Sequence, residues 1–363
     1  MIAPGVRGSG QGAVRALFVC NAGPAVGGGH VMRSLALARA LEASGVSCIF
    51  AGPAEVGTIL DAYGPSEPRL AAATSPQALA TATADLGFEL AIFDHYGLDA
   101  QTQAQIAAGR PCLVIDEMCD RPVFADILVD TTPGRPASAW DGKVRSGAEI
   151  LTGPRNAPLR PEFAALRDQA LARRATGGPA RRILVAMGLT DLDAISLEVV
   201  RTLLPLRDGL QILIATGARA PSLSALIELA RAEPRIEVHV DAPDMASLSA
   251  SCDLCVGAPG SSAWERCVLG LPSVLVVLAQ NQAQAGQNLE EMGAALVMPR
   301  LQGAAFAQRL GGLVERLLDD EALRRRLSAT SAALCDGRGA ERLAERLLAL
   351  LDARSGGSRS DLT

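Results

Sequence analysis

Residues 16–41 read ALFVCNAGPAVGGGHVMRSLALARAL, and this stretch decides the fold. An apolar run, Ala16 to Cys20, is followed by the glycine loop 27–29 and then by a helical pattern, residues 34–41. A strand, a glycine loop and a helix start in this succession indicate a βα unit. Such a loop gathers free backbone N–H groups and the positive end of a helix dipole, where an anion can bind. His30, one of three histidines in the chain, falls at this loop.

The same alternation of apolar runs and Ala/Leu-rich helical segments continues along the chain. Ten runs are predicted as strands: 16–20, 46–51, 90–94, 112–116, 127–130, 182–186, 211–216, 236–240, 254–257 and 273–278. Continuous apolar strands that alternate with helices are typical of parallel sheets covered on both faces. The two series predict an α/β protein of two doubly wound, Rossmann-like domains. Ligands of such domains bind beyond the carboxyl ends of the strands, here in an interdomain cleft.

A change in composition marks the expected boundary between the domains. Residues 170–180 read ALARRATGGPA, a charged and then Gly/Pro-rich segment without a hydrophobic period, and are predicted as the linker. The two domains are therefore expected at residues 14–170 and 181–353. Residues 131–156 are rich in Gly, Pro and Arg and are predicted as an irregular excursion of the first domain.

Composition excludes several classes of protein. The 363 residues are 49% hydrophobic, which suffices for two cores, but no apolar run approaches the ~18–20 residues of a membrane span. A net charge of −5 gives no excess of basic residues for binding nucleic acid, and 3% aromatic residues offer few rings for base stacking. Residues 1–13 lack the apolar segment of a signal peptide and, like residues 354–363, are predicted to be disordered. We therefore expect a cytoplasmic monomer whose partner is a small molecule.

The eight cysteines are scattered, mostly within apolar runs, which is typical of buried free thiols. Cys252 and Cys255 have the C-x-x-C spacing of redox and zinc sites, but no second Cys/His pair stands at a metal-like distance. We expect neither a metal site nor a cofactor.

Polar residues follow several predicted strands of the first domain. A helix N-terminus keeps the imidazole of His30 neutral, which suits a general base near pH 7, although a histidine that merely caps the helix fits the same pattern. Asp94, His95 and Tyr96 end the third strand and form either a substrate-contacting or base-orienting cluster or a capped loop. Asp116 and Glu117, after the fourth strand, hold sugar hydroxyls or orient a base, or else they cap the next helix.

The second domain offers a candidate diphosphate site in residues 257–266, GAPGSSAWER. Two glycines and two serines at a helix start present N–H and O–H donors, and Glu265 can accept from ribose hydroxyls. The competing interpretation is a serine-capped helix with Glu265 and Arg266 on a solvated face. Residues 188–191 form a second candidate oxyanion loop. Asn281, beyond the last predicted strand, suits hydrogen bonding to a sugar or a base.

Seven ordered sets of motifs run from about residue 17 to residue 350. They are GHVMR (29–33) with LALA (35–38), DHYGLD (94–99), VID (114–116) with DRP (120–122), GP (153–154) with LRPEF (159–163), WERC (264–267) with LGLPS (269–273), NQ (281–282) and DGRGA (336–340). Together they resemble the UDP-2,4-diacetamido-2,4,6-trideoxy-β-L-altropyranose hydrolases of pseudaminic acid biosynthesis. That family is related to the MurG-type glycosyltransferases and has the two-domain GT-B fold.

The resemblance implies a hydrolase that releases UDP from a 6-deoxy diacetamido sugar nucleotide, with inverting attack of water at the anomeric carbon and no metal. It assigns the general base to His30. The implied sugar-binding residues are Gly29, Arg33, Asp94, Tyr96 and Asn281. The implied UDP-binding residues are Thr190, Gly260, Ser261, Ser262 and Glu265, the last of them at the ribose.

The chain departs from the family pattern at three positions. Leu189 stands where the loop after the first strand of the second domain has a glycine, and Pro259 removes one N–H donor from the phosphate loop. Gln280 stands where the family has an aspartate. These departures leave His30 and Glu265 in place and bear on the sugar more than on UDP.

Three other functions compete with hydrolysis. A glycosyltransferase of the same fold would need an acceptor site, and no basic-apolar stripe for a membrane-associated acceptor occurs in the N-terminal half. A non-catalytic nucleotide-sugar-binding protein would not need a general base at His30. A nicotinamide-dependent oxidoreductase is disfavoured because Val31 and Met32 stand where the third glycine of Gly-x-Gly-x-x-Gly is due.

Overall fold

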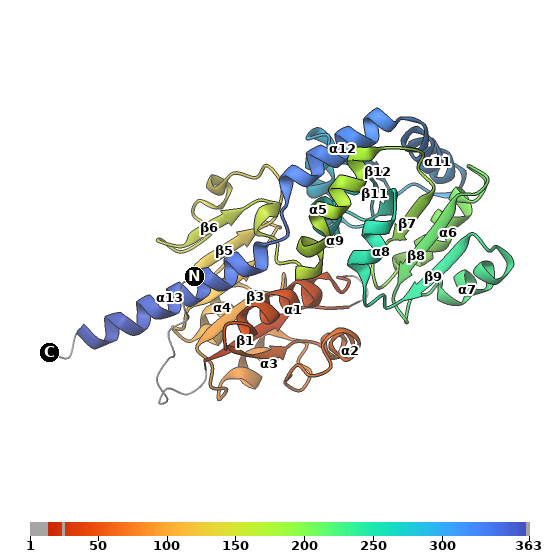
Figure 1. The fold of residues 1–363 in the computed structure, drawn as a ribbon. Coiled ribbons are helices and arrows are strands. Elements are labelled where there is room, and N and C mark those ends of the chain that lie inside the picture. The colour runs from red at the N-terminus through yellow and green to blue at the C-terminus, as the bar shows by residue number, and fades with distance from the viewer. Residues whose placement is uncertain (1–13, 24–25, 361–363) are drawn as a thin grey trace.

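Two six-stranded parallel sheets, each flanked by helices, form the framework of the protein (Figure 1). The computed structural model describes residues 14–23 and 26–360. The strand order is β2-β1-β3-β4-β5-β6 in the first sheet and β12-β11-β10-β7-β8-β9 in the second. The part built around each sheet is called the first half and the second half below. This architecture confirms the predicted pair of doubly wound, Rossmann-like domains.

The strands of the first sheet are β1 (Arg15–Cys20), β2 (Ser47–Ala51), β3 (Leu90–Asp94), β4 (Cys112–Ile115), β5 (Ile127–Asp130) and β6 (Glu149–Thr152). The strands of the second sheet are β7 (Arg182–Ala186), β8 (Gln211–Thr216), β9 (Ile236–Val240), β10 (Leu254–Gly257), β11 (Ser273–Val277) and β12 (Leu296–Pro299). All ten predicted strands are present, and the two that the sequence missed, β6 and β12, are both edge strands.

The helices of the first half are α1 (Gly29–Glu42), α2 (Ala54–Tyr63), α3 (Pro76–Thr83) and α4 (Ala100–Ala107), with the 3-10 turns η1 (Ala137–Trp140) and η2 (Pro154–Asn156). The second half contains η3 (Leu192–Ala194), α6 (Ile195–Leu203), α7 (Leu223–Ala232), α8 (Met245–Ser251), α9 (Ser262–Val268), α10 (Gln280–Glu291), α11 (Gly303–Asp319) and α12 (Glu321–Leu334). Two long helices, α5 (Pro161–Thr176) and α13 (Gly339–Ser360), connect the halves.

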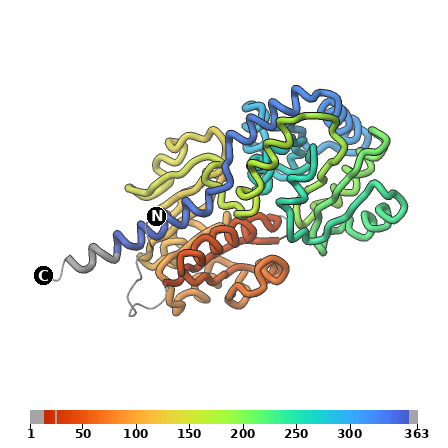
Figure 2. Tube along the Cα trace, viewed as in Figure 1, coloured from red at the N-terminus to blue at the C-terminus, as the bar shows by residue number. Residues whose placement is uncertain are grey.

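Helix α1 is apolar on nearly all of its faces because the protein covers it from both sides. One side lies on the first sheet, and the other is covered by α13, whose Leu343, Ala344 and Leu347 join the same hydrophobic cluster as Leu35. The chain thus ends on the half in which it begins. Figure 2 shows this terminal blue segment running back along the red and orange first half.

The predicted linker contains helix rather than an open loop. Helix α5 continues through residues 170–176 and packs against α8, α9 and α12 of the second half. The domain limits 14–170 and 181–353 stay a prediction, which the crossing of α13 back to the first half complicates.

Residues 354–360, for which disorder is predicted, continue helix α13. The guanidinium of Arg354 anchors the helix there, because it pairs with Asp126 and donates to the carbonyl oxygen of Gly109. Residues 1–13 and 361–363, for which disorder is also predicted, lie outside the described residues.

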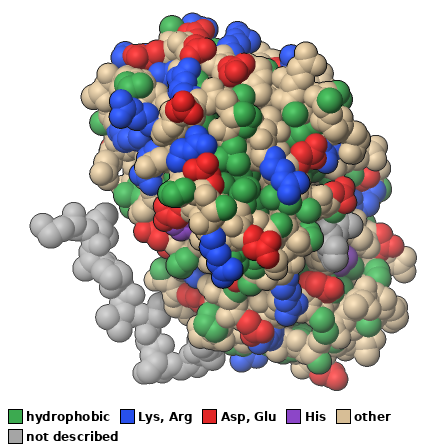
Figure 3. All heavy atoms as spheres, turned by 90° about the vertical axis from the view of Figure 1, so that its right-hand side faces the viewer, with side chains coloured by type: hydrophobic (Ala, Val, Ile, Leu, Met, Phe, Trp, Pro, Cys, Tyr) green, Lys and Arg blue, Asp and Glu red, His purple; other side chains and the backbone are tan. Residues whose placement is uncertain are grey.

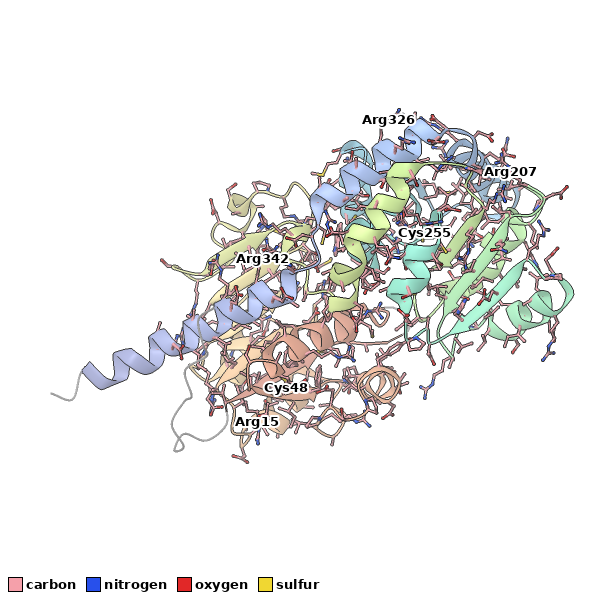
Figure 4. All side chains as sticks on the ribbon, viewed as in Figure 1. Arg15, Cys48, Arg207, Cys255, Arg326 and Arg342 are labelled. Atoms are coloured by element: carbon pink, nitrogen blue, oxygen red, sulfur yellow. The ribbon has the colours of Figure 1, made fainter. Side chains whose placement is uncertain are left out.

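All eight cysteines lie in the described part of the chain as free thiols, and only Cys119 is not buried. Figure 4 places Cys48 in the first half and Cys255 in the second. Burial raises the pKa of Cys252 to about 12 and that of Cys255 to about 11, so both remain protonated thiols near neutral pH. This protonation argues against a redox or metal role for the C-x-x-C pair.

The surface matches the composition. On the face seen in Figure 3, basic and acidic side chains are interspersed. Within the described residues, none of the helices combines the length and apolarity needed to cross a membrane.

Candidate active site

A cavity of about 280 Å³ lies between the halves, where the carboxyl ends of their strands converge. Its walls are formed by residues that follow β1, β3, β4 and β5 on one side and β7, β8, β9, β10 and β11 on the other. This position is the interdomain cleft that the fold class predicts.

The cavity brings together ten of the eleven predicted site residues. From the first half it is lined by Gly29, His30, Arg33 and Tyr96, and from the second by Thr190, Gly260, Ser261, Ser262, Glu265 and Asn281. Their individual binding roles stay predictions. Asp94 is the exception, because its side chain is fully buried behind His30 and does not reach the cavity. In this structure Asp94 contacts His30, and its contact with substrate stays a prediction.

His30 stands in the first turn of α1, with Nδ1 hydrogen-bonded to Oδ1 of Asp94 at the end of β3. An ionised carboxylate only accepts hydrogen bonds, so Nδ1 must carry the proton. In the neutral ring, the other nitrogen, Nε2, is then the one without a proton. This is the arrangement by which a buried carboxylate orients a histidine that acts as a base.

Arg33, one helical turn after His30, holds Asp94 in place. Its Nε donates to Oδ2 of Asp94 at 2.5 Å and its Nη2 donates to Oδ1 at 2.6 Å. The same guanidinium donates to both carboxylate oxygens of Glu117, at 2.5 and 3.1 Å. Asp94 and Glu117 therefore hold the Arg33 guanidinium in one orientation. Arg33 in turn holds Asp94, the hydrogen-bond partner of His30.

Glu117 also accepts hydrogen bonds from the hydroxyls of Tyr96, at 2.5 Å, and Thr131, at 2.8 Å. The ring of Tyr96 packs edge-on against that of His30, with centroids 4.6 Å apart. The sequence around Glu117 is compatible with sugar binding, base orientation or capping. The structure places it at the centre of the network that positions Arg33 and Tyr96.

The pKa values of the network follow from burial and charge. Burial alone would raise the pKa of Asp94, but the positive Arg33 and the hydrogen bond from His30 lower it to about 2. Arg33 likewise outweighs burial and lowers the pKa of Glu117. Burial next to Glu117 raises the pKa of Tyr96 well above its usual value. At neutral pH both acids are ionised and the phenol is protonated.

The opposite wall contains residues 258–262, called the serine turn below, which connect β10 to α9. Arg266, on α9, donates from Nη2 to the carbonyl oxygen of Ala258 at 2.6 Å and from Nη1 to Oγ of Ser262 at 3.1 Å. It is 3% exposed, so the alternative that places Arg266 on a solvated face is wrong. Glu265 lines the cavity, and its Oε1 accepts from Nε and Nη2 of Arg160 at 3.0 and 2.9 Å.

The two walls come into contact at Gly28, the N-cap of α1, and at Gly29, its first residue. A Cβ on Gly28 would lie 2.9 Å from Cδ1 of Leu189, and one on Gly29 would lie 3.1 Å from Oγ of Ser261. A third link runs from Nε1 of Trp264, next to Glu265, to Oγ1 of Thr131 at 3.2 Å. The glycines of the first-half loop thus permit close approach of the second half.

Two residues singled out in the sequence turn away from the cavity. His95 accepts a hydrogen bond from the backbone N–H of Gly97 at 3.1 Å, and burial beside His30 lowers its pKa to about 4. Asp116 pairs with Arg121 at 2.8 Å, and burial raises its pKa to about 6. Both stabilise loops.

Sequence reasoning missed several lining residues, among them Tyr63, Thr131, Arg160, Thr216 and Met245. Each lies at or next to an end of a secondary-structure element, but none stands in a glycine-rich or acidic pattern that would have marked it. Within the described residues, no group of three or more His, Cys, Asp or Glu side chains is arranged to hold a metal ion.

No protein-family model matches the sequence. The chain is similar to the UDP-2,4-diacetamido-2,4,6-trideoxy-β-L-altropyranose hydrolase of Campylobacter jejuni, with 24% identity over 282 residues, 77% of this chain and 97% of that protein. It is also similar to the spore coat polysaccharide biosynthesis protein SpsG of Bacillus subtilis, with 24% identity over 69% of this chain and 74% of SpsG.

The fold resembles that of MurG from Acinetobacter baumannii, with a TM-score of 0.60 and 18% identity, over 92% of this chain and 99% of MurG. These similarities confirm the resemblance that the sequence motifs indicate and the GT-B type of the fold.

Proposed function

We propose that this protein hydrolyses a UDP-linked 2,4-diacetamido-2,4,6-trideoxy sugar, the β-L-altropyranose, to UDP and the free sugar, with His30 as the general base. The observation that carries the proposal is the His30–Asp94 pair at the cavity, across from the serine turn. The similarity to the Campylobacter jejuni hydrolase over most of both chains supports the same activity.

In the proposed step, Nε2 of His30 accepts a proton from water as the water oxygen forms a bond to the anomeric carbon. The bond from that carbon to the diphosphate oxygen breaks, and its electron pair leaves with UDP. Attack from the face opposite the leaving group inverts the configuration of the anomeric carbon. A general base in hydrogen-bond reach of such a water contributes about 10²- to 10⁴-fold in rate.

The first half is arranged to accept the proton. With His30 neutral, the formal charges of Arg33, Asp94 and Glu117 sum to −1, so protonation of His30 brings this wall to neutrality. Asp94 stays ionised because its pKa is about 2, and it stabilises the imidazolium that forms.

The second half supplies the groups that we assign to UDP. The serine turn offers the hydroxyls of Ser261 and Ser262, and Thr190 lies on a neighbouring loop of the same wall. Hydrogen-bond donors positioned where charge develops on the leaving diphosphate lower the barrier. Glu265 is assigned to the ribose, and Asn281 and Tyr96 to the sugar.

The direct test is to incubate the protein with the UDP-sugar, without an acceptor or added metal, and to measure UDP release and the anomer formed by NMR. We expect release of UDP with inversion. UDP release that requires a sugar or lipid acceptor would instead identify a glycosyltransferase, and binding without any release would identify a nucleotide-sugar-binding protein.

A histidine of the same chain provides the control. His239 lies on β9, where it pairs with Glu237 at 3.0 Å, and does not line the cavity. The variant H239Q is expected to release UDP at the wild-type rate.

A further inference from the structure

Arg266 is a buried cation without a counter-charge. Its side chain is 3% exposed, its two hydrogen-bonded partners are the neutral oxygens of Ala258 and Ser262, and its Nε has no partner. In the described part of the chain it forms no ion pair, and its neighbour Glu265 pairs with Arg160 instead. Burying an arginine without a carboxylate is costly, which indicates that something else balances its charge.

A comparison with Arg324 shows what is unusual about Arg266. Arg324 is also buried and also donates only to neutral oxygens, those of Leu317, Leu318 and Gly178. The first two carbonyls belong to the last turn of α11, where the negative end of the helix dipole balances a cation. Arg266 has no such helix end among its hydrogen-bond partners.

The contacts of Arg266 make the serine turn receptive to an anion. Because Nη1 donates to Oγ of Ser262, the hydroxyl proton of Ser262 is left to donate to another acceptor. Nη2 donates to the carbonyl oxygen of Ala258, so this negatively polarised oxygen is paired within the protein and repels an anion less. Ser262 lines the cavity, so the hydroxyl that Arg266 polarises can reach a ligand there.

The local sequence provides the space for this arrangement. A Cβ on Gly257 would lie 3.0 Å from Nη1 of Arg266 and 3.1 Å from its Cζ. A side chain at position 257 would therefore push the guanidinium away from the serine turn.

We propose that Arg266 is the built-in counter-charge for the diphosphate of the nucleotide, acting through the Ser262 hydroxyl from behind the serine turn. The proposal rests on the proposed function, which places UDP at this wall. Arg266 is a positioning residue in this scheme, because it does not line the cavity itself. In this scheme the negative charge of the bound diphosphate balances the positive charge of Arg266.

The test compares ligands that share the uridine part and differ in the number of phosphate groups, and therefore in charge. Binding of UDP, UMP and uridine is measured by calorimetry for the wild type, R266K, R266Q and the control R324Q. For R266Q we expect about tenfold weaker binding of UDP, a smaller loss for UMP and little change for uridine, since the lost attraction scales with ligand charge. R266K is expected to keep the preference of the wild type for UDP over UMP.

Melting temperatures separate this role from a structural one. Without ligand, R266Q is expected to melt close to the wild type, because removing an unbalanced buried charge offsets its lost hydrogen bonds. R324Q is expected to melt lower and to keep the UDP-to-UMP preference. Equal losses for UDP, UMP and uridine in R266Q would overturn the proposal.

Other outcomes are equally decisive. If R266Q does not fold, R266K decides: a retained preference for UDP supports the proposal, and a lost preference overturns it. A wild-type protein that binds no UDP would overturn the proposed function, whereas unchanged UDP affinity in R266Q would overturn only the role of Arg266.

Discussion

The two walls of the cavity carry surplus charges of opposite sign. On the first-half wall, Arg33 is matched by two carboxylates and the network carries one surplus negative charge. On the second-half wall, Arg266 carries a positive charge that no carboxylate matches in the described residues. A surplus negative charge stabilises the cation that the proposed general base becomes, and a surplus positive charge favours an anion. The difference supports the proposal that the base acts from one wall and the leaving group is held by the other.

The largest effect is expected from removing the base. H30Q should lower kcat by about 10³-fold, because water then has no proton acceptor at the anomeric carbon. UDP affinity should change little, since the second-half wall is intact. Steady-state kinetics and calorimetry with UDP measure the two quantities. A variant with near wild-type kcat would show that His30 is not the base.

Removing the partner of the base should have the next largest effect. D94N should lower kcat by about 10²-fold, because Asn presents a polar group that no longer fixes the Nδ1–H tautomer or stabilises the imidazolium. D126N is the matched control, since Asp126 is a buried acid that accepts from the backbone N–H of Cys112 at 2.8 Å, remote from the cavity lining. Equal loss of kcat in both variants would point to a general effect of losing a buried acid.

Asp94 should also leave a signature in the pH dependence of stability. Its folded pKa of about 2 lies below the ordinary 3.8, so its ionisation stabilises the fold above pH 4. That contribution, about 2 kcal/mol, is lost as the pH falls from about 4 to about 2. Urea unfolding of the wild type and D94N across this window measures it. A constant difference between the two proteins at all pH values would contradict the assignment.

The smallest effect concerns the contact between the walls. L189G removes the apolar side chain that reaches Gly28 and should raise KM about three- to fivefold with little change in kcat, because substrate binding must then offset the lost contact between the walls. V240A, which truncates an exposed apolar side chain on β9, is the control. A lower KM in L189G would show instead that Leu189 obstructs the substrate.

The sequence predicts the central strands well and two edge strands not at all. Strands β1, β3 and β10 are buried along most or all of their length and therefore read as apolar runs. Strand β6, with the sequence EILT, is only half-buried, and β12 ends in Pro299. At a sheet edge neither full burial nor every backbone donor is required, so the apolar signal weakens there.

The candidate site shows the same limit at the level of single residues. His30, Tyr96 and the serine turn were found because they stand at strand ends in recognisable motifs. The burial of Asp94 and the pairing of Glu265 with Arg160 depend on contacts between segments far apart in sequence. Arg266 follows Glu265 directly, yet its burial is set by packing that the local pattern does not encode.

The return of α13 to the first half sets the order in which the protein can be completed during synthesis. Helix α1 emerges from the ribosome roughly 300 residues before the helix that covers it. At about 5 to 20 residues per second, its apolar face waits about 15 to 60 seconds for Leu343 and Leu347. The first half, whose strands are made first, thus receives its covering helix only after the elements of the second half have been made.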